Sequence, residues 1–183
     1  AEKTNGSMAA VLKLDADTVE RLCSSYEHVY PVNYNCPGQI SVAGLKEELA
    51  DFSAEVKKAG GRTVPIRVNG VFHSPLMTEA AEKFGKVLYN FDIDEAKITL
   101  YSDYTAKPYE GEYRKLLAKQ ICRPVRWQKI VEDMIEHGVD TFIEIGPGKT
   151  LCGLIKKINA EVQILHVEDS ESLNHTVKEV LGC

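Results

Sequence analysis

One histidine lies in a setting suited to proton transfer. The stretch Gly70-Val71-Phe72-His73-Ser74-Pro75-Leu76-Met77 places His73 between a strand-like run ending at Val68 and residues with helical spacing that begin at Leu76. Imidazole titrates near neutral pH, so a histidine held at such a junction can accept and return a proton when its ring faces a cleft. A lone histidine is more often structural than catalytic, and this stretch alone leaves both interpretations open.

Three further motifs accompany this histidine. One precedes it, Asn33-Tyr34-Asn35-Cys36-Pro37-Gly38-Gln39, and two follow it, Lys119-Gln120-Ile121-Cys122-Arg123-Pro124-Val125-Arg126-Trp127 and Glu144-Ile145-Gly146-Pro147-Gly148-Lys149-Thr150-Leu151. With these motifs the chain closely resembles the malonyl-CoA:acyl carrier protein transacylases of bacterial fatty-acid synthesis. It is also similar to the acyltransferase domains of fatty-acid and polyketide synthases. The resemblance extends from about Gly6 to the C-terminus.

The nucleophile of this family has no counterpart in the sequence. Family members carry a Gly-x-Ser-x-Gly elbow in an N-terminal portion, whereas Ser7, Ser41, Ser74 and Ser102 all lack the two flanking glycines. The glutamine of the oxyanion hole and the arginine that holds the malonyl carboxylate are expected in that same portion. We therefore expect the chain to be the C-terminal part of a transacylase, which supplies the base without the nucleophile and is inactive alone.

The resemblance implies roles for two residues. In the family's reaction a serine takes the acyl group from coenzyme A and passes it to a carrier-protein thiol, and His73 is expected to be the general acid/base. The main-chain carbonyl of Gln120 is expected to accept a hydrogen bond from the ring and fix its tautomer, in place of a triad carboxylate. Without the resemblance, Gln120 would be interpreted as a surface residue at a helix C-terminus. No cofactor is implied.

Two residues near the expected cleft are candidates for substrate binding. Family members specific for malonyl groups often carry Phe before the histidine, as Phe72 does here, and those accepting methylmalonyl often carry Ser. A bulky ring leaves less room for a branched acyl group, although Phe72 also suits a core. Asn35 is either a polar contact to substrate or a turn-forming residue. Asp103 stands where relatives commonly have Asn, which puts a hydrogen-bonding role there in doubt.

Gly146-Pro147-Gly148-Lys149-Thr150 superficially resembles a phosphate-binding loop. The G-x-x-x-x-G-K-[ST] pattern requires glycine at position 143, and Ile143 stands there, so nucleotide hydrolysis is excluded. Gly148 is still a candidate substrate-binding residue, because the loop joins a strand to a helix N-terminus that can line an active-site mouth or bind an anion. A tight turn required by packing is an equal alternative.

Composition narrows the possible functions. The chain has 183 residues and a formal net charge of −5, which disfavours nucleic-acid binding. No stretch has the ~20 apolar residues of a membrane helix, and no secretory signal is evident, so we expect a cytoplasmic protein without a membrane partner. The segment from Tyr113 to Lys129 is basic and has no acidic residue. It forms either solvated helix faces or a docking surface for an acidic partner.

The five cysteines show no metal-binding spacing. They are scattered singly, with no C-x-x-C pair and no zinc-like Cys/His cluster, at Cys23, Cys36, Cys122, Cys152 and Cys183. We therefore expect reduced packing thiols and no metal site. A cysteine nucleophile paired with His73 is an alternative without further support.

The first third of the chain has the pattern βαββαβ. Strand-like runs are predicted at residues 8–14, 29–35, 40–43 and 62–68, with helices from an Asp15 cap and at residues 45–59. This is the ferredoxin-like split-βαβ arrangement, and it agrees with the small subdomain that the resemblance implies at residues 7–68. The fold class is therefore α/β.

Residues 69–183 are expected to be the C-terminal portion of the α/β-hydrolase-like large subdomain. Helices are predicted at residues 75–88, 111–122, 125–137 and 149–158 and after a Ser170 cap, and strands at residues 98–102, 141–145 (buried) and 163–167. These strands suggest an incomplete parallel sheet, which a companion must cover. That companion is the missing N-terminal portion or a self-association partner, and the polar residues 1–7 are expected to be a loop between subdomains.

Two functions therefore remain. The first is a malonyl transacylase whose partners are malonyl-CoA and acyl carrier protein. The second is a non-catalytic module that binds acyl carrier protein through its basic helices.

Overall fold

The computed structural model describes residues 5–182, in two compact units that comprise residues 1–130 and 131–183. The two units are described separately. The subdomain boundary expected after residue 68 stays a prediction. Of the loop expected at residues 1–7, residues 1–4 lie outside the described residues, and Gly6 and Ser7 belong to the first strand rather than to a loop. Backbone pairing with Gly44 and Leu45 gives them this conformation.

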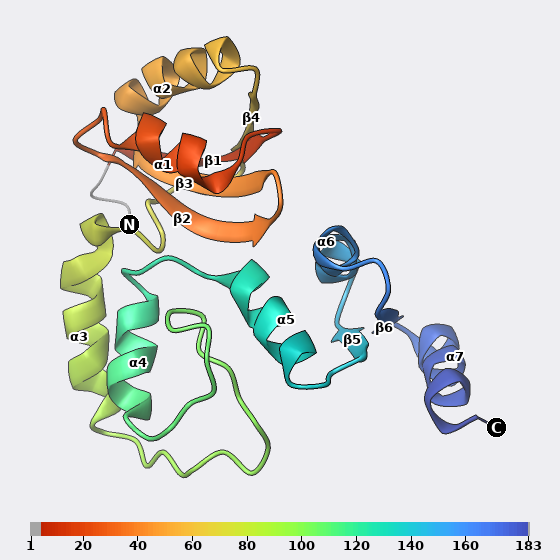
Figure 1. The fold of residues 1–183 in the computed structure, drawn as a ribbon. Helices are drawn as coiled ribbons and strands as arrows, with labels where there is room; N and C mark the ends of the chain where they lie inside the picture. Colours follow the sequence, from red (N-terminus) through yellow and green to blue (C-terminus); the bar gives the residue numbers. More distant parts are fainter. Residues whose placement is uncertain (1–4, 183) are drawn as a thin grey trace. The chain divides into compact units, whose positions relative to one another are not determined.

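The first unit contains a four-stranded antiparallel sheet with the strand order β2-β3-β1-β4 (Figure 1). Its elements are β1 (Gly6–Leu12), α1 (Ala16–Cys23), β2 (Val29–Cys36), β3 (Gln39–Leu45), α2 (Lys46–Lys58) and β4 (Arg62–Ile66). The chain order βαββαβ with this strand order is the ferredoxin-like arrangement. The α/β fold class and the ferredoxin-like subdomain are thus confirmed.

Local sequence signals explain two of the boundaries in this sheet. Asp15 caps α1 by accepting a hydrogen bond from the Thr18 N–H at 2.7 Å, as predicted. Cys36 pairs with Gln39 across a two-residue turn in which Gly38 has a φ of +72°, a value that glycine adopts readily. The turn fixes the register of β2 against β3.

The sheet has a hydrophobic core on each face. On one face, α1 and α2 pack on the sheet, where Phe52 of α2 and the strand residues Val11 and Val42 are all completely buried. On the other, Val32 and Val71 pack with a second cluster completed by Met8, Ala43, Met77, Ala81 and Cys122. Alternate residues of each strand point to opposite faces, which explains why Met8 and Ala9 belong to different cores. The second core joins the sheet to the chain that carries His73.

The rest of the first unit is helical and irregular. A short 3₁₀ turn, η1 (Pro75–Met77), leads into α3 (Thr78–Leu88), and α4 (Tyr113–Gln120) follows after a long loop. The strand predicted at residues 98–102 is wrong. Tyr101 forms only an isolated bridge to Pro108, and proline has no N–H with which to extend a ladder. Residues 100–109 form a closed loop instead, held by the Ser102 and Tyr109 amides on the Lys107 and Leu100 carbonyls.

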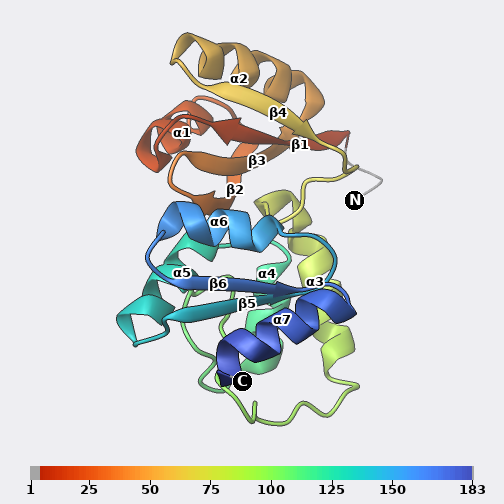
Figure 2. The same cartoon turned by 90° about the vertical axis from the view of Figure 1, so that its right-hand side faces the viewer.

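Helix α5 (Trp127–Glu136) leads into the second unit, which contains a parallel βαβ motif. Its elements are β5 (Thr141–Ile145), α6 (Thr150–Ile158), β6 (Gln163–Val167) and α7 (Ser170–Leu181). Figure 2 shows α6 above the two strands and α7 below them. The predicted strand positions are confirmed, and the two strands are parallel.

Two predictions for the second unit are wrong. Helix α7 is capped by Asp169 rather than Ser170, because the Asp169 carboxylate accepts the Ser172 N–H at 2.8 Å. Strand β5 is not buried among the described residues, since Ile145 is 81% exposed and Ile143 is 41% exposed. The strand has a single neighbour, β6, so one of its edges is unpaired in the described chain. No helix of the described residues is long and apolar enough to cross a membrane.

Candidate active site

His73 occupies a tightly anchored turn. Val71 and Ser74 on either side are completely buried, and the Ser74 hydroxyl donates to the Val71 carbonyl at 2.6 Å. His73 itself is partly exposed and has a φ of +61°, in the left-handed region that costs an ordinary L-residue about 1–2 kcal/mol. A positive φ at a non-glycine residue persists where the surrounding structure holds the backbone in place, and such residues often lie at functional sites.

The C-terminus of α4 binds His73 at two points. The His73 N–H donates to the Ile121 carbonyl at 3.1 Å, and the ring Nδ1 lies 2.7 Å from the Gln120 carbonyl oxygen. The last carbonyls of a helix have no intrahelical partner, so both are available as acceptors. A carbonyl can only accept, which assigns the proton to Nδ1 and leaves Nε2 as the acceptor of the neutral ring. The structure thus brings His73 and Gln120 together in a geometry suited to a general base.

A third residue near the ring is Asp103. Burial raises the pKa of this carboxyl above its ordinary value, and the positive charge available on His73 partly opposes the effect. The Asp103 main-chain carbonyl accepts the Arg126 N–H at 2.9 Å. The electrostatic effect of His73 on this carboxyl indicates that an acidic side chain, rather than the amide common in relatives, lies near the histidine.

Phe72 and Asn35 lie in the same unit as His73. Phe72 directly precedes the histidine and is 37% exposed, so it is not a fully buried core aromatic. Asn35 lies within β2 rather than in the following turn, and the turn-forming alternative is therefore wrong. Its Nδ2 donates to the Ser41 hydroxyl at 3.2 Å. Substrate contact stays a prediction for both residues.

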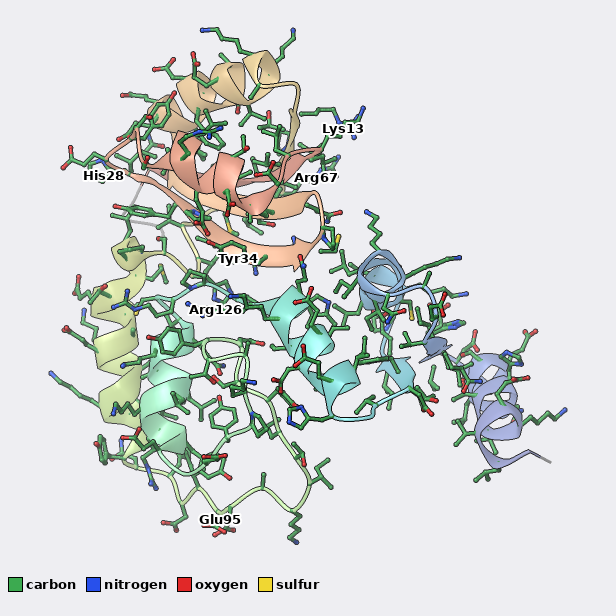
Figure 3. The ribbon with its side chains drawn as sticks, viewed as in Figure 1. Lys13, His28, Tyr34, Arg67, Glu95 and Arg126 are labelled. Atoms are coloured by element: carbon green, nitrogen blue, oxygen red, sulfur yellow. The ribbon has the colours of Figure 1, made fainter. Side chains whose placement is uncertain are left out.

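The edge of β2 connects the sheet to the segment that follows Gln120. The Tyr34 N–H donates to the Val125 carbonyl and the Val125 N–H to the Val32 carbonyl, each at 2.9 Å. Figure 3 shows Tyr34 on this edge, with Arg126 beside it on the segment that enters α5. Burial, the Glu20 carboxylate that accepts the Tyr34 hydroxyl and further negative charge raise the pKa of Tyr34 well above its ordinary value.

Gly148 belongs to the second unit, and its backbone amide already has an acceptor. The Gly148 N–H donates to Glu168 Oε2 at 2.9 Å. The first amides of α6 are also occupied, since the Glu144 carboxylate accepts the Leu151 and Cys152 N–H groups at 3.1 and 2.8 Å. These carboxylates fill the positions that a bound anion requires. The structure therefore supports the packing-turn interpretation of this loop and offers Gly148 no free amide for substrate.

The thiols are poor candidates for the nucleophile. Burial raises the pKa of Cys23 to about 12 and that of Cys152 to about 11. Cys36 and Cys122 are also buried, whereas Cys183 lies outside the described residues. A thiol with such a raised pKa carries little thiolate at neutral pH. Between residues 5 and 182, no group of three or more His, Cys, Asp or Glu side chains is arranged to hold a metal ion.

The basic segment around α4 is largely engaged within its own unit. Arg114 donates to the Leu88 and Phe91 carbonyls at 3.2 and 2.6 Å, and Lys115 pairs with Glu112 at 2.7 Å. The Lys119 ammonium lies 5.6 Å from the centre of the Tyr104 ring. These contacts account for several of the charges without an external partner, and the docking-module interpretation is not favoured.

Sequence reasoning missed two residues that contact Gln120. The Ser102 and Tyr109 hydroxyls donate to the Gln120 side-chain Oε1 at 3.1 and 2.5 Å. Both belong to the closed loop at residues 100–109. Their position depends on how this loop closes, and the sequence carries no periodic signal for that. The only signal in the sequence for these contacts is the residue type, since buried Ser and Tyr hydroxyls usually form hydrogen bonds.

A ferredoxin-like sheet and a parallel βαβ unit define an α/β protein, in which a main-chain carbonyl holds the ring of a partly exposed histidine. The chain belongs to the acyl transferase domain family, whose model matches residues 1–176. It is 37% identical over 181 residues to the malonyl CoA-acyl carrier protein transacylase of Bacillus subtilis (strain 168), and 40% identical over 178 residues to that of Staphylococcus aureus (strain COL). These matches cover 94% and 92% of the chain, and 57% of each relative.

Solved structures agree with this assignment. The malonyl CoA-acyl carrier protein transacylase of Clostridium perfringens superposes on the whole chain with a TM-score of 0.94 and 37% identity, and 59% of that protein is covered. A malonyl-transacylase in complex with its type II PKS acyl-carrier protein matches 96% of the chain with a TM-score of 0.93 and 32% identity, again over 59% of its length. The chain thus spans somewhat less than two thirds of the length of these relatives. Over that length it has the same acyltransferase fold.

Proposed function

We propose that this chain provides the general acid/base of a malonyl transacylase, which moves a malonyl group from coenzyme A to acyl carrier protein through a serine ester. The names of the relatives support the substrates, since they are malonyl CoA-acyl carrier protein transacylases. The single observation that carries the proposal for this chain is the 2.7 Å contact between His73 Nδ1 and the Gln120 carbonyl. The proposal includes a cytoplasmic location and a role in fatty-acid synthesis.

Each half-reaction needs a proton to be moved. In the first, Nε2 of His73 accepts the serine proton as the hydroxyl attacks the malonyl thioester, and then returns it to the departing coenzyme A sulfur. In the second, Nε2 accepts the carrier-protein thiol proton and returns it to the serine oxygen when the thioester forms. The Gln120 carbonyl keeps the proton of Nδ1 in place throughout, as an Asp does in the Ser-His-Asp arrangement.

The serine in this scheme comes from a segment outside the 183 residues, because the sequence contains no Gly-x-Ser-x-Gly. The chain alone is therefore expected to transfer no malonyl group. Phe72 and Asn35 are proposed to line the acyl pocket. Gly148, in the second unit, is proposed as a substrate-binding residue only through the turn that it forms, since its amide is occupied by Glu168.

The proposal is tested by complementation. The chain is mixed with, or fused to, the Gly-x-Ser-x-Gly-bearing N-terminal portion of the Bacillus subtilis relative, and malonyl transfer from malonyl-CoA to holo carrier protein is followed by intact mass. Transfer should appear only in the mixture. His73→Ala should reduce it by roughly 10²–10⁴-fold, the usual contribution of a general acid/base.

The matched control is His175→Ala, which removes an exposed histidine on α7 and should leave the rate unchanged. Transfer that persists undiminished in His73→Ala would contradict the proposal. Salt-sensitive binding of carrier protein without any transfer in the complemented sample would instead support the docking-module alternative.

A further inference from the structure

The side chain of Gln120, and not only its carbonyl, is held in place. Its Oε1 accepts hydrogen bonds from the Ser102 hydroxyl at 3.1 Å and the Tyr109 hydroxyl at 2.5 Å. Ser102 is completely buried, and Gln120 is partly buried. Two donors on one amide oxygen satisfy both of its acceptor positions. The loop at residues 100–109 therefore holds, through hydrogen bonds to its side chain, the same residue whose carbonyl contacts His73.

These hydrogen bonds can affect the direction of the Gln120 carbonyl because Gln120 is the last residue of α4. Helix ends fray, and at this end the Ile121 and Cys122 amides make the shorter-range bonds of a tightened last turn, to the Ala118 and Lys119 carbonyls at 3.3 and 3.1 Å. The direction of a carbonyl in the last turn of a helix is less well fixed than that of one inside the helix. Fixing the side chain limits this motion and keeps the carbonyl aimed at the His73 ring.

The loop at residues 100–109 is itself restrained. The Ser102 N–H donates to the Lys107 carbonyl at 2.9 Å and the Tyr109 N–H to the Leu100 carbonyl at 2.8 Å, which closes the loop. The Tyr109 ring stacks on Tyr113 of α4, with ring centres 5.1 Å apart and an angle of 12° between the planes. Burial also raises the pKa of Tyr109, so its hydroxyl keeps the proton that it donates.

We propose that Ser102 and Tyr109 are positioning residues for the base, which fix the tautomer and direction of the His73 ring through the side chain of Gln120. The effect on catalysis rests on the proposed function, whereas the effect on the ring does not. Neither residue touches the histidine through any contact described above, so each acts only through Gln120. In this arrangement the base is aligned from two sequence segments, the end of α4 and the 100–109 loop.

The test uses the chain itself, with its histidines labelled with ¹⁵N, and measures the tautomer of His73 by two-bond ¹H–¹⁵N correlation near pH 8. In the parent chain His73 should populate almost entirely the tautomer with the proton on Nδ1. Tyr109→Phe keeps the stacked ring and removes only the hydroxyl. It should raise the share of the other tautomer roughly tenfold, the equivalent of about one hydrogen bond. Ser102→Ala should act in the same direction.

The matched control is Tyr104→Phe, which removes a hydroxyl from the same loop at a residue that contacts Lys119 rather than Gln120. It should leave the His73 signals unchanged. Gln120→Met keeps the main-chain carbonyl and removes the side-chain Oε1 that Ser102 and Tyr109 contact. It should reproduce the Tyr109→Phe spectrum. All variants are compared at equal folded fraction, measured by circular dichroism, so that general unfolding cannot imitate the effect.

An unchanged His73 tautomer in folded Tyr109→Phe, Ser102→Ala and Gln120→Met would overturn the proposal. An equal change in Tyr104→Phe would also overturn it, because the effect would then come from a general change in the loop and not from the lost hydrogen bonds to Gln120. In the complemented transacylase assay, Tyr109→Phe should lower kcat, with little change in the KM for malonyl-CoA. A spectrum that changes as expected, together with no malonyl transfer in the complemented sample, would refute the proposed function and leave the positioning role standing.

Discussion

At the scale of single residues, the histidine and its carbonyl partner were predictable, whereas the contacts that hold the Gln120 side chain were not. The motif around His73 and the one around Gln120 identify both residues, and the structure places the ring 2.7 Å from the carbonyl. The pattern of the sequence carries no record of the Ser102 and Tyr109 contacts, because they depend on the closure of an irregular loop. Asn35 lies in strand β2, so its turn-forming interpretation is wrong, and its contact with substrate stays a prediction.

Phe72 offers a test of acyl-group selection at this scale. Replacement by Ser should allow methylmalonyl-CoA to compete with malonyl-CoA, because the ring no longer occupies the space that an α-methyl group needs. The expected gain in the ratio of kcat/KM for methylmalonyl over malonyl is about 10–100-fold, the range for one methyl-sized group in an apolar pocket. Competition assays in the complemented enzyme measure it. The Phe72→Leu variant, which keeps most of the bulk, should shift the ratio far less, and equal shifts in both would argue against a steric role.

At the scale of secondary-structure elements, periodicity and caps predicted most of the molecule. The βαββαβ order, the Asp15 cap and the strand at residues 163–167 are confirmed because each has a strong local signal. The strand at residues 98–102 failed because a β-branched and aromatic run does not ensure a pairing partner. The Ser170 cap failed by one residue, since Asp and Ser are comparable caps and Asp169 reaches the Ser172 amide.

Helix α6 provides a stability test. Its preceding residue, Lys149, makes no side-chain cap, and Glu144 on β5 supplies the missing acceptor for two amides. Glu144→Ala should therefore lower the free energy of unfolding by about 1 kcal/mol at pH 7, a typical value for a lost cap. Glu144→Gln keeps an acceptor oxygen and should lose less. Urea unfolding measures both variants, and an equal loss in the two would show that bulk rather than hydrogen bonding matters.

The same carboxylate predicts a pH dependence. Burial raises the pKa of Glu144, but the Cys152 and Leu151 amides outweigh this and hold the pKa below its ordinary value of 4.5. A pKa that is lower in the folded state stabilises the fold above the unfolded value, and the contribution disappears as the pH falls through the folded value. The stability difference between the parent chain and Glu144→Gln should thus be constant above pH 5 and shrink below pH 4. A difference that grows on acidification would reverse the sign and contradict the assignment.

At the scale of the whole molecule, the two faces of the antiparallel sheet serve different purposes. One core packs α1 and α2 onto the sheet, while the other, which contains Val71, joins the sheet to the turn of His73. The strand-like runs in the sequence predicted the strands but not which face of the sheet supports the site. Nor did they predict the exposure of β5, because burial depends on which segments of the protein surround a strand.

A matched pair of substitutions separates these two cores. Val56→Ala and Val71→Ala each remove the same two methyl groups from a completely buried position, one in each core. Each should lower the free energy of unfolding by roughly 2 kcal/mol through lost burial and a small cavity. Only Val71→Ala should also broaden or shift the ring signals of His73 in the folded protein. Equal perturbation of these signals by both would show that the cores are not separable.

The backbone conformation of His73 has an evolutionary consequence. A φ of +61° is a conformation in which Gly, and to a lesser degree Asn, is more comfortable than most residues. Folding alone would therefore favour Gly at this position, and on the proposed function it is the demand for proton transfer that retains an imidazole there. A descendant that had lost acyl transfer should replace the histidine early, with a gain in stability. Gly or Asn at this turn would then identify lineages that have kept the fold and abandoned the chemistry.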